Sequence, residues 1–92
     1  MQQIVINACH GGFGLSEKLL EMYRKEVDDP EAADWAIPRE HPVLIRLVKE
    51  LGEEANTRFS QLKIVEIPDG IEWTICEYDG LEWVAEAHRT WS

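Results

Sequence analysis

The chain has 92 residues, of which 45% are hydrophobic and 29% are charged. This length and composition predict one folded domain over residues 1–92, because the chain can build one hydrophobic core and is too apolar to be disordered. Eighteen Asp and Glu residues against nine Lys and Arg give a formal net charge of −9. A charge of this sign repels phosphate backbones and anionic lipid heads, so we expect no nucleic acid and no membrane as a partner.

The sequence also carries signals about cellular location and redox state. No apolar run approaches the roughly 20 residues that span a membrane, and the first residues lack the basic and apolar regions of a signal peptide. We therefore expect a cytoplasmic protein. The two cysteines, Cys9 and Cys76, are too few for a disulfide framework, and their apolar surroundings predict buried free thiols.

The first elements are a strand and a helix joined by a glycine-rich turn. Residues 3–8 form a short β-branched run, which favours a strand. Gly11, Gly12 and Gly14 then allow backbone conformations with positive φ, so the chain turns there. Ser16 is placed to cap a helix that continues to residue 26 or 27, with one apolar face and one polar face.

The middle of the chain is a long irregular stretch followed by a second helix. Residues 28–41 are polar and acidic, and we expect only one short helical turn around residues 31–35. Long loops in compact domains are often functional, so Trp35 and Arg39 are of interest. Pro42 suits the first position of a helix whose apolar stripe continues across Gly52, a residue that weakens a helix.

The last third of the chain predicts three strands, over residues 62–67, 72–78 and 81–90. Asp79-Gly80 lies between the last two and favours a two-residue type I′ hairpin turn. In that register the paired residues are Ile75 with Val84, Cys76 with Trp83, and Tyr78 with Leu81. We predict an α+β fold of order β-α-α-β-β-β, with one small, mostly antiparallel sheet of about four strands and two amphipathic helices packed on one face of it.

The glycine-rich turn ACHGGFGLS is the most suggestive local motif. Backbone N–H groups between a strand and a helix can bind an anion at the helix N-terminus. The dinucleotide fingerprint fails because Glu17 stands where its third glycine belongs, and no Gly-Lys-Ser/Thr follows as in a Walker motif. A tight turn that only lets the strand and the helix pack is the alternative interpretation.

The C-terminal residues AHRTW carry a second group of candidates. On a strand, His88 and Thr90 share one face, while Arg89 and Trp91 share the other. A guanidinium beside an indole can hold a planar anionic ligand or a protein partner. The alternative is a terminal edge strand whose tryptophan completes the core.

The remaining reactive residues do not form a catalytic or metal-binding motif. The three histidines lack metal-ligand spacing, and a nucleophile pair of Cys9 or Cys76 with His88 would require the fold to bring the two residues together. Glu77 and Glu82 face one another across the predicted hairpin, but eighteen acidic residues make such pairs common. We therefore predict no catalytic residue, no metal and no cofactor, with a small Cys/His enzyme as a remaining alternative.

Three segments together carry a family resemblance: IVINACHGGFGLS, LVKELGEEAN and IPDGIEWTICEYDGLEWVAEAHRTW. They resemble a family of small uncharacterised proteins encoded by tailed bacteriophages and prophages. The resemblance covers about two thirds of the chain and is weakest in the acidic loop 28–40. It implies a phage protein made in the cytoplasm of a bacterial host, of the size of accessory factors that counter host defences. It supplies no functional residues.

These observations lead to two main functional hypotheses. The first is a phage accessory protein, forming a homo-oligomer, that sequesters a small phosphate-bearing nucleotide signal of host defence. Its predicted ligand-binding residues are Gly11, Gly12, Phe13, Gly14, Ser16, His88, Arg89 and Trp91. The second is an acidic interaction protein that blocks a basic surface of a host protein in the manner of a DNA mimic, as the net charge indicates.

Overall fold

The computed structural model of the protein describes residues 1–86. The elements in chain order are β1 (Gln2–Asn7), α1 (Glu17–Glu26), α2 (Pro42–Leu51), the short 3₁₀ helix η1 (Gly52–Ala55), β2 (Leu62–Ile67), β3 (Trp73–Tyr78) and β4 (Leu81–Glu86). This order confirms the predicted α+β class. The candidates His88, Arg89 and Trp91 lie outside the described residues.

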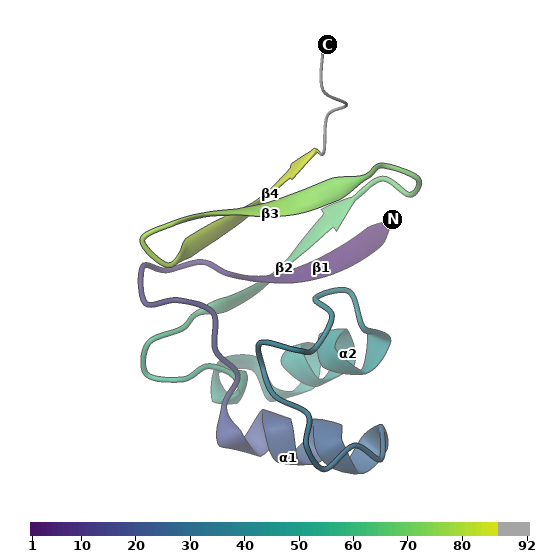
Figure 1. The fold of residues 1–92 in the computed structure, drawn as a ribbon, viewed down its shortest axis with the longest axis vertical. Coiled ribbons are helices and arrows are strands. Elements are labelled where there is room, and N and C mark those ends of the chain that lie inside the picture. Colours follow the sequence, from purple (N-terminus) through teal and green to yellow (C-terminus); the bar gives the residue numbers. More distant parts are fainter. Residues whose placement is uncertain (87–92) are drawn as a thin grey trace.

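The elements form three layers, with the helices at the bottom of Figure 1, β1 and β2 in the middle, and β3 and β4 at the top. The strand pairs of residues 1–86 are antiparallel, as predicted, but they form two two-stranded sheets, β1 with β2 and β3 with β4, and not the single sheet expected. The β3–β4 hairpin packs over the β1–β2 pair as a separate layer (Figure 1). Both helices lie on the same side of the β1–β2 pair, as predicted. No helix among the described residues is long and apolar enough to cross a bilayer.

Helix α1 follows its sequence signals. The Ser16 side chain caps it by accepting a hydrogen bond from the Leu19 N–H at 3.2 Å, which satisfies one of the donors left unpaired at a helix start. The helix ends at Glu26 and places Leu19, Leu20 and Tyr23 in the core. The predicted start and end are therefore confirmed.

Helix α2 begins as predicted but ends earlier. His41 caps it through Nδ1, which accepts from the Val43 N–H at 3.1 Å, and Pro42 is the first helical residue. The expected continuation across Gly52 is wrong: Gly52 has a φ of 57° and closes the helix, and η1 follows. The short helical turn expected around residues 31–35 does not form a helix either: this segment has only isolated turns.

Strand β1 is buried on both faces. Val5 packs in the core on the side of the sheet that the helices cover, opposite its strand partner Ile64. Because side chains alternate along a strand, Ile4 and Ile6 point to the other face, and they are also buried, under the β3–β4 hairpin. The hairpin therefore acts as the third layer of the fold.

The β3–β4 hairpin has the predicted register. Ile75 pairs with Val84, Cys76 with Trp83, and Tyr78 with Leu81. Asp79 and Gly80 have φ values of 52° and 91°, and both being positive fits the type I′ turn that Asp-Gly favours.

Candidate functional site

The glycine-rich turn is held between two other loops. A Cβ on Gly11 would lie 1.7 Å from the carbonyl oxygen of Phe59, and a Cβ on Gly80 would lie 2.6 Å from both the Gly12 nitrogen and the His10 oxygen. No larger residue fits at Gly11 or Gly80 without moving main-chain atoms. The turn, the loop before β2 and the hairpin turn therefore meet at closest approach, which gives Gly11 a packing role.

Asn7 at the end of β1 joins these loops. Its Nδ2 donates to the carbonyl oxygens of Cys9 and Gly80, both at 2.7 Å, and its Oδ1 accepts from the Gln61 N–H at 2.8 Å. The residue is fully buried, and a buried amide needs such partners. Sequence reasoning missed Asn7; the only signal was a lone amide at the end of an apolar strand.

The other candidates in this turn also have partners within the fold. The ring of Phe13 lies 3.5 Å from the guanidinium carbon of Arg39, a cation–π contact. The Gly14 carbonyl accepts from the Ser60 hydroxyl at 2.8 Å, and Ser16 caps α1. Gly12 has a φ of 95°, and a Cβ added to it would meet no atom within 4 Å beyond those of its chain neighbours. The fold thus brings Gly11, Gly12, Phe13 and Gly14 to one end of the molecule, beside the hairpin turn.

An ion pair between Arg39 and Glu82 connects the long loop to the hairpin. The two guanidinium nitrogens donate to the two carboxylate oxygens at 2.7 and 2.9 Å, the bidentate geometry that gives strong charge-assisted bonds. The side chain of Glu82 is 8% exposed and that of Arg39 is 21% exposed. This pair, called the Arg39–Glu82 pair below, is the most buried ion pair among the described residues.

The same two residues cover the outer edge of β1. The Arg39 carbonyl accepts from the Val5 N–H at 2.9 Å, and its Nη1 donates to the Val5 carbonyl at 3.2 Å. Glu82 Oε1 accepts from the Asn7 N–H at 2.9 Å. An exposed strand edge is a template for unwanted pairing, so the Arg39–Glu82 pair both protects β1 and attaches the hairpin.

The predicted facing of Glu77 and Glu82 is present in the register, but the two side chains have different roles. Glu77 is exposed and accepts from the Gly80 N–H at 2.7 Å, within the turn. Glu82 is bonded to Arg39 and Asn7 instead. The two residues therefore do not form a paired carboxylate site.

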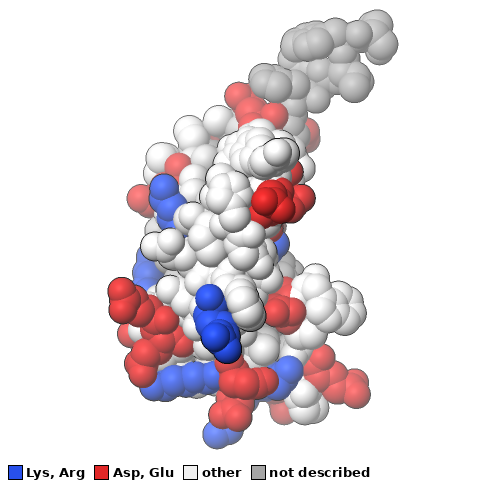
Figure 2. Space-filling view, turned by 90° about the vertical axis from the view of Figure 1, so that its left-hand side faces the viewer, with Lys and Arg blue, Asp and Glu red and all other residues white. Residues whose placement is uncertain are grey.

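The β3–β4 hairpin exposes apolar side chains on the side away from β1. This outer hairpin face is made by alternate residues: Thr74, Cys76, Tyr78, Leu81, Trp83 and Ala85. Tyr78 is 71% exposed and Trp83 is 45% exposed. Figure 2, seen from the side that carries the hairpin turn, shows a broad area without charged residues over the upper part of the molecule, with Asp and Glu and also some Lys or Arg at its edges.

The hairpin region is also uniformly acidic. Residues 68–86 contain six Asp and Glu residues and no Lys or Arg. Glu82 pairs with Arg39, and Asp69 pairs with the N-terminal amine at 3.0 Å. The other four, Glu72, Glu77, Asp79 and Glu86, have no ion pair within residues 1–86. The outer hairpin face is therefore an apolar surface on a segment with a negative formal charge.

The helices carry the opposite pattern, with mixed charges that neutralise one another. Arg46 bonds Glu26, and it also bonds Glu50 at 2.9 Å. These two hydrogen bonds raise the pKa of Arg46 above its usual value. Lys18 reaches Glu54 at 3.2 Å. The uncompensated acidic residues are therefore found in the hairpin region and in the long loop 28–41, whose five Asp and Glu residues also form no ion pair within residues 1–86.

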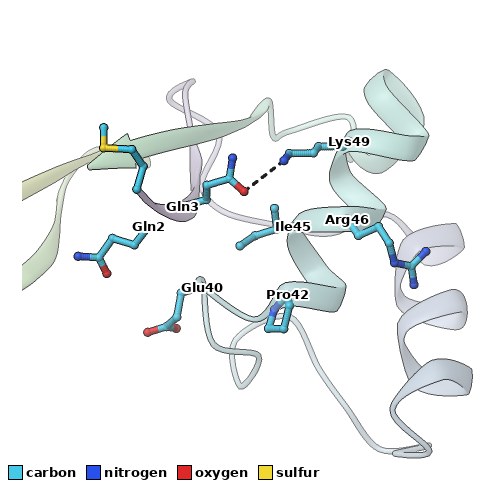
Figure 3. Close-up of a pocket in the computed structure, with 8 residues that line it drawn as sticks. Gln2, Gln3, Glu40, Pro42, Ile45, Arg46 and Lys49 are labelled. Carbon is cyan, nitrogen blue, oxygen red and sulfur yellow. Dashed lines mark hydrogen bonds between the residues drawn. The ribbon is translucent and has the colours of Figure 1, made fainter. Parts of the chain in front are cut away.

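A hollow lies on the helical side, between the start of β1 and α2 (Figure 3). Its volume is about 470 Å³, within the range typical of small-molecule sites. Gln3, Glu40, Ile45 and Lys49 are among its lining residues. None of these residues was singled out by the sequence, because they come from three separate segments.

The cysteines are half-buried free thiols, so the prediction of full burial is wrong. Cys9 Sγ lies 3.3 Å from the Phe59 carbonyl oxygen, and Cys76 is on the outer hairpin face. Within residues 1–86, no three His, Cys, Asp or Glu side chains gather as metal ligands would.

Comparisons with protein-family models, with curated proteins and with solved structures find no match to this chain.

Proposed function

We propose that this protein is a non-catalytic interaction protein whose outer hairpin face binds a basic surface of another protein. The observation that carries the proposal is the exposure of Tyr78 and Trp83 within a segment that has six acidic residues and no basic one. Tyr and Trp contribute most per residue to protein interfaces. Carboxylates around them favour partners of opposite charge.

The family resemblance suggests the setting of this interaction. A phage accessory protein acts on proteins of its bacterial host, so the proposed partner is a host protein with a basic surface, such as one that binds nucleic acid. Occupying that surface would block its normal ligand. In this proposal the net charge of −9 guides the encounter, and the aromatic side chains hold the complex.

The test is capture of bacterial proteins on the immobilised protein, with matched variants. A Tyr78→Ser/Trp83→Ser double variant removes the aromatic side chains, and Trp35→Ser removes another exposed tryptophan, 86% exposed in the long loop. The proposal predicts a protein that the wild type and Trp35→Ser capture, that the double variant does not, and that carries a basic surface. Capture should fall as the Debye length shrinks from about 10 Å at 0.1 M salt to about 3 Å at 1 M. A partner indifferent to salt, or to the double variant, would contradict it.

A second candidate function is binding of a small phosphate-bearing ligand at the glycine-rich turn. Two observations favour it. No hydrogen bond within residues 1–86 takes up the backbone N–H of Gly11 or Phe13, and Arg58 forms no ion pair there. Arg58 precedes the exposed ring of Phe59, which contacts the turn through its carbonyl. A cation, a ring and main-chain donors fit a nucleotide.

Calorimetry against a panel of cyclic and linear nucleotides tests this second candidate. Binding that Arg58→Gln weakens and Lys25→Gln leaves unchanged would support it, since Lys25 is an exposed cation on α1. Native mass spectrometry of the purified protein measures its oligomeric state, which we expect to be a homo-oligomer, and detects any ligand retained during purification. No binding across the panel would remove this candidate and leave the interaction proposal standing.

A further inference from the structure

The hollow between β1 and α2 combines an apolar centre with two opposite charges. Ile45 and Pro42 are among its apolar lining residues, and Figure 3 shows Lys49 and Glu40 on opposite sides of Ile45. Arg46 is at the rim, and its guanidinium points away from the other labelled side chains. Arg46 is also bonded to Glu26 and Glu50. The N-terminal ammonium of Met1, another lining residue, is paired with Asp69. Lys49 and Glu40 are therefore the charged lining residues without an ion pair within residues 1–86.

Both charges lack an ionic partner within the described residues. The Lys49 ammonium donates to the neutral Oε1 of Gln3 at 3.1 Å, and no ion pair within residues 1–86 includes Lys49 or Glu40. Gln3 is oriented by Glu66, whose Oε2 accepts from its Nε2 at 3.4 Å. The amide thus presents its oxygen to Lys49 and holds the ammonium at the edge of the hollow. Lys25 and Lys63 also form no ion pair within residues 1–86, so what distinguishes Lys49 is its place beside the hollow and its hydrogen bond to Gln3.

We propose that this hollow binds a zwitterion whose ammonium and carboxylate are separated by an apolar chain, such as an ω-amino acid or a short peptide. Its carboxylate would bond Lys49, its ammonium would bond Glu40, and its methylene groups would cover Ile45 and Pro42. The net charge of −9 opposes the approach of an anion. A zwitterion has no net charge, so the overall field costs it little while both local charges attract it.

NMR titration of ¹⁵N-labelled protein with 6-aminohexanoate tests this inference. Hexanoate and hexylamine serve as probes that keep the apolar chain and only one of the two charges. The inference predicts saturable shifts of the Gln3, Ile45 and Lys49 amides with 6-aminohexanoate and weaker binding of both single-charge probes. Equal binding of hexanoate or hexylamine, or shifts that do not saturate, would overturn it.

Charge-neutral variants locate the site. Lys49→Gln and Glu40→Gln each remove one of the two charges that would bind the ligand. Each should weaken the binding of 6-aminohexanoate about two- to five-fold, the range of an exposed ion pair. Lys25→Gln and Glu21→Gln make the same charge changes on the exposed face of α1 and should leave the affinity unchanged. Equal weakening by the two pairs of variants would show a general charge effect and would contradict the site.

Discussion

The two sides of the β1–β2 sheet are covered in different ways. On the helical side, Leu19, Leu44 and Leu47 are fully buried and form one apolar core with Val5. On the hairpin side, no apolar side chain of β3 or β4 is fully buried. The helical layer therefore supplies most of the buried apolar area, while the apolar side chains of the hairpin layer remain partly exposed to solvent.

Polar contacts join the hairpin to the rest of the molecule. Gln2 donates to the carbonyls of Pro68 and Ile71 and accepts from the Trp73 indole at 3.2 Å. Asn7 and the Arg39–Glu82 pair hold the other end. Hydrogen bonds are directional while apolar contacts are not, so these contacts fix where the hairpin lies without covering its outer face. That arrangement suits a surface that binds a partner.

The largest expected effect is the difference in stability lost when an apolar residue is truncated in the helical layer and in the hairpin layer. Leu44→Ala creates a cavity in the core and should lower the free energy of unfolding by about 2–5 kcal/mol. Val84→Ala in the hairpin removes half-buried methyl groups and should cost about 1 kcal/mol. Urea denaturation of both variants measures the difference. Equal losses would mean that the hairpin carries as much of the core as the helices do.

Breaking the Arg39–Glu82 pair comes next. Glu82→Ala leaves a mostly buried guanidinium and the Asn7 N–H without their acceptor, and should cost about 2–3 kcal/mol after allowing for the partial exposure of Arg39. Glu77→Ala, at the facing position of the same hairpin, should cost less than about 1 kcal/mol because Glu77 is exposed. Denaturation midpoints compare the two. A loss for Glu82→Ala no larger than for Glu77→Ala would contradict the attachment role.

Two glycines with similar backbone conformations give a matched comparison of packing. Gly70 and Gly80 have φ values of 84° and 91°, but only Gly80 has main-chain atoms within 4 Å of an added Cβ. Gly70→Ala should cost about 1–2 kcal/mol from backbone strain alone. Gly80→Ala should cost about 1–3 kcal/mol more, because the hairpin turn must move off the glycine-rich turn. Similar thermal midpoints for both variants would show that the contact is loose.

The smallest expected effect on stability comes from Tyr23, whose titration tests whether its side chain is buried in the helical layer. Burial, with a smaller contribution from Asp29, raises the pKa of Tyr23 above its ordinary value of 10.0. Because the folded state holds this proton more tightly, its stabilising contribution is complete below about pH 10 and is lost as the pH rises through the folded pKa. Tyr23→Phe should flatten the alkaline fall in stability, measured by denaturation from pH 9 to 11. An unchanged slope would place the phenol in water.

Local signals predicted much of this fold. Ser16 and Pro42 marked the two helix starts, and Asp79-Gly80 set the register of the hairpin, because capping and turn residues act through neighbours in the chain. Gly52 was harder to interpret. The apolar pattern continues past it, but a positive φ ended the helix there.

The connections between segments were not predictable in the same way. Arg39 lies 43 residues from Glu82, and Asn7 lies 73 residues from Gly80. One arginine among many acidic residues gives no sign of its partner, since the fold alone brings them together. The same is true of the hollow, which joins β1, the long loop and α2. Sequence therefore located the glycine-rich turn but not the contacts that give it a packing role.

Native-state hydrogen exchange tests most directly whether the hairpin is a separate layer attached by polar contacts. The account predicts that amides of β3 and β4 open with a free energy lower by at least about 1 kcal/mol than the Ile4 and Ile6 amides of β1, since segments with few buried apolar contacts open locally. Glu82→Ala should lower the hairpin value further. Equal opening free energies in both layers would contradict the account, because the hairpin would then unfold only together with the core.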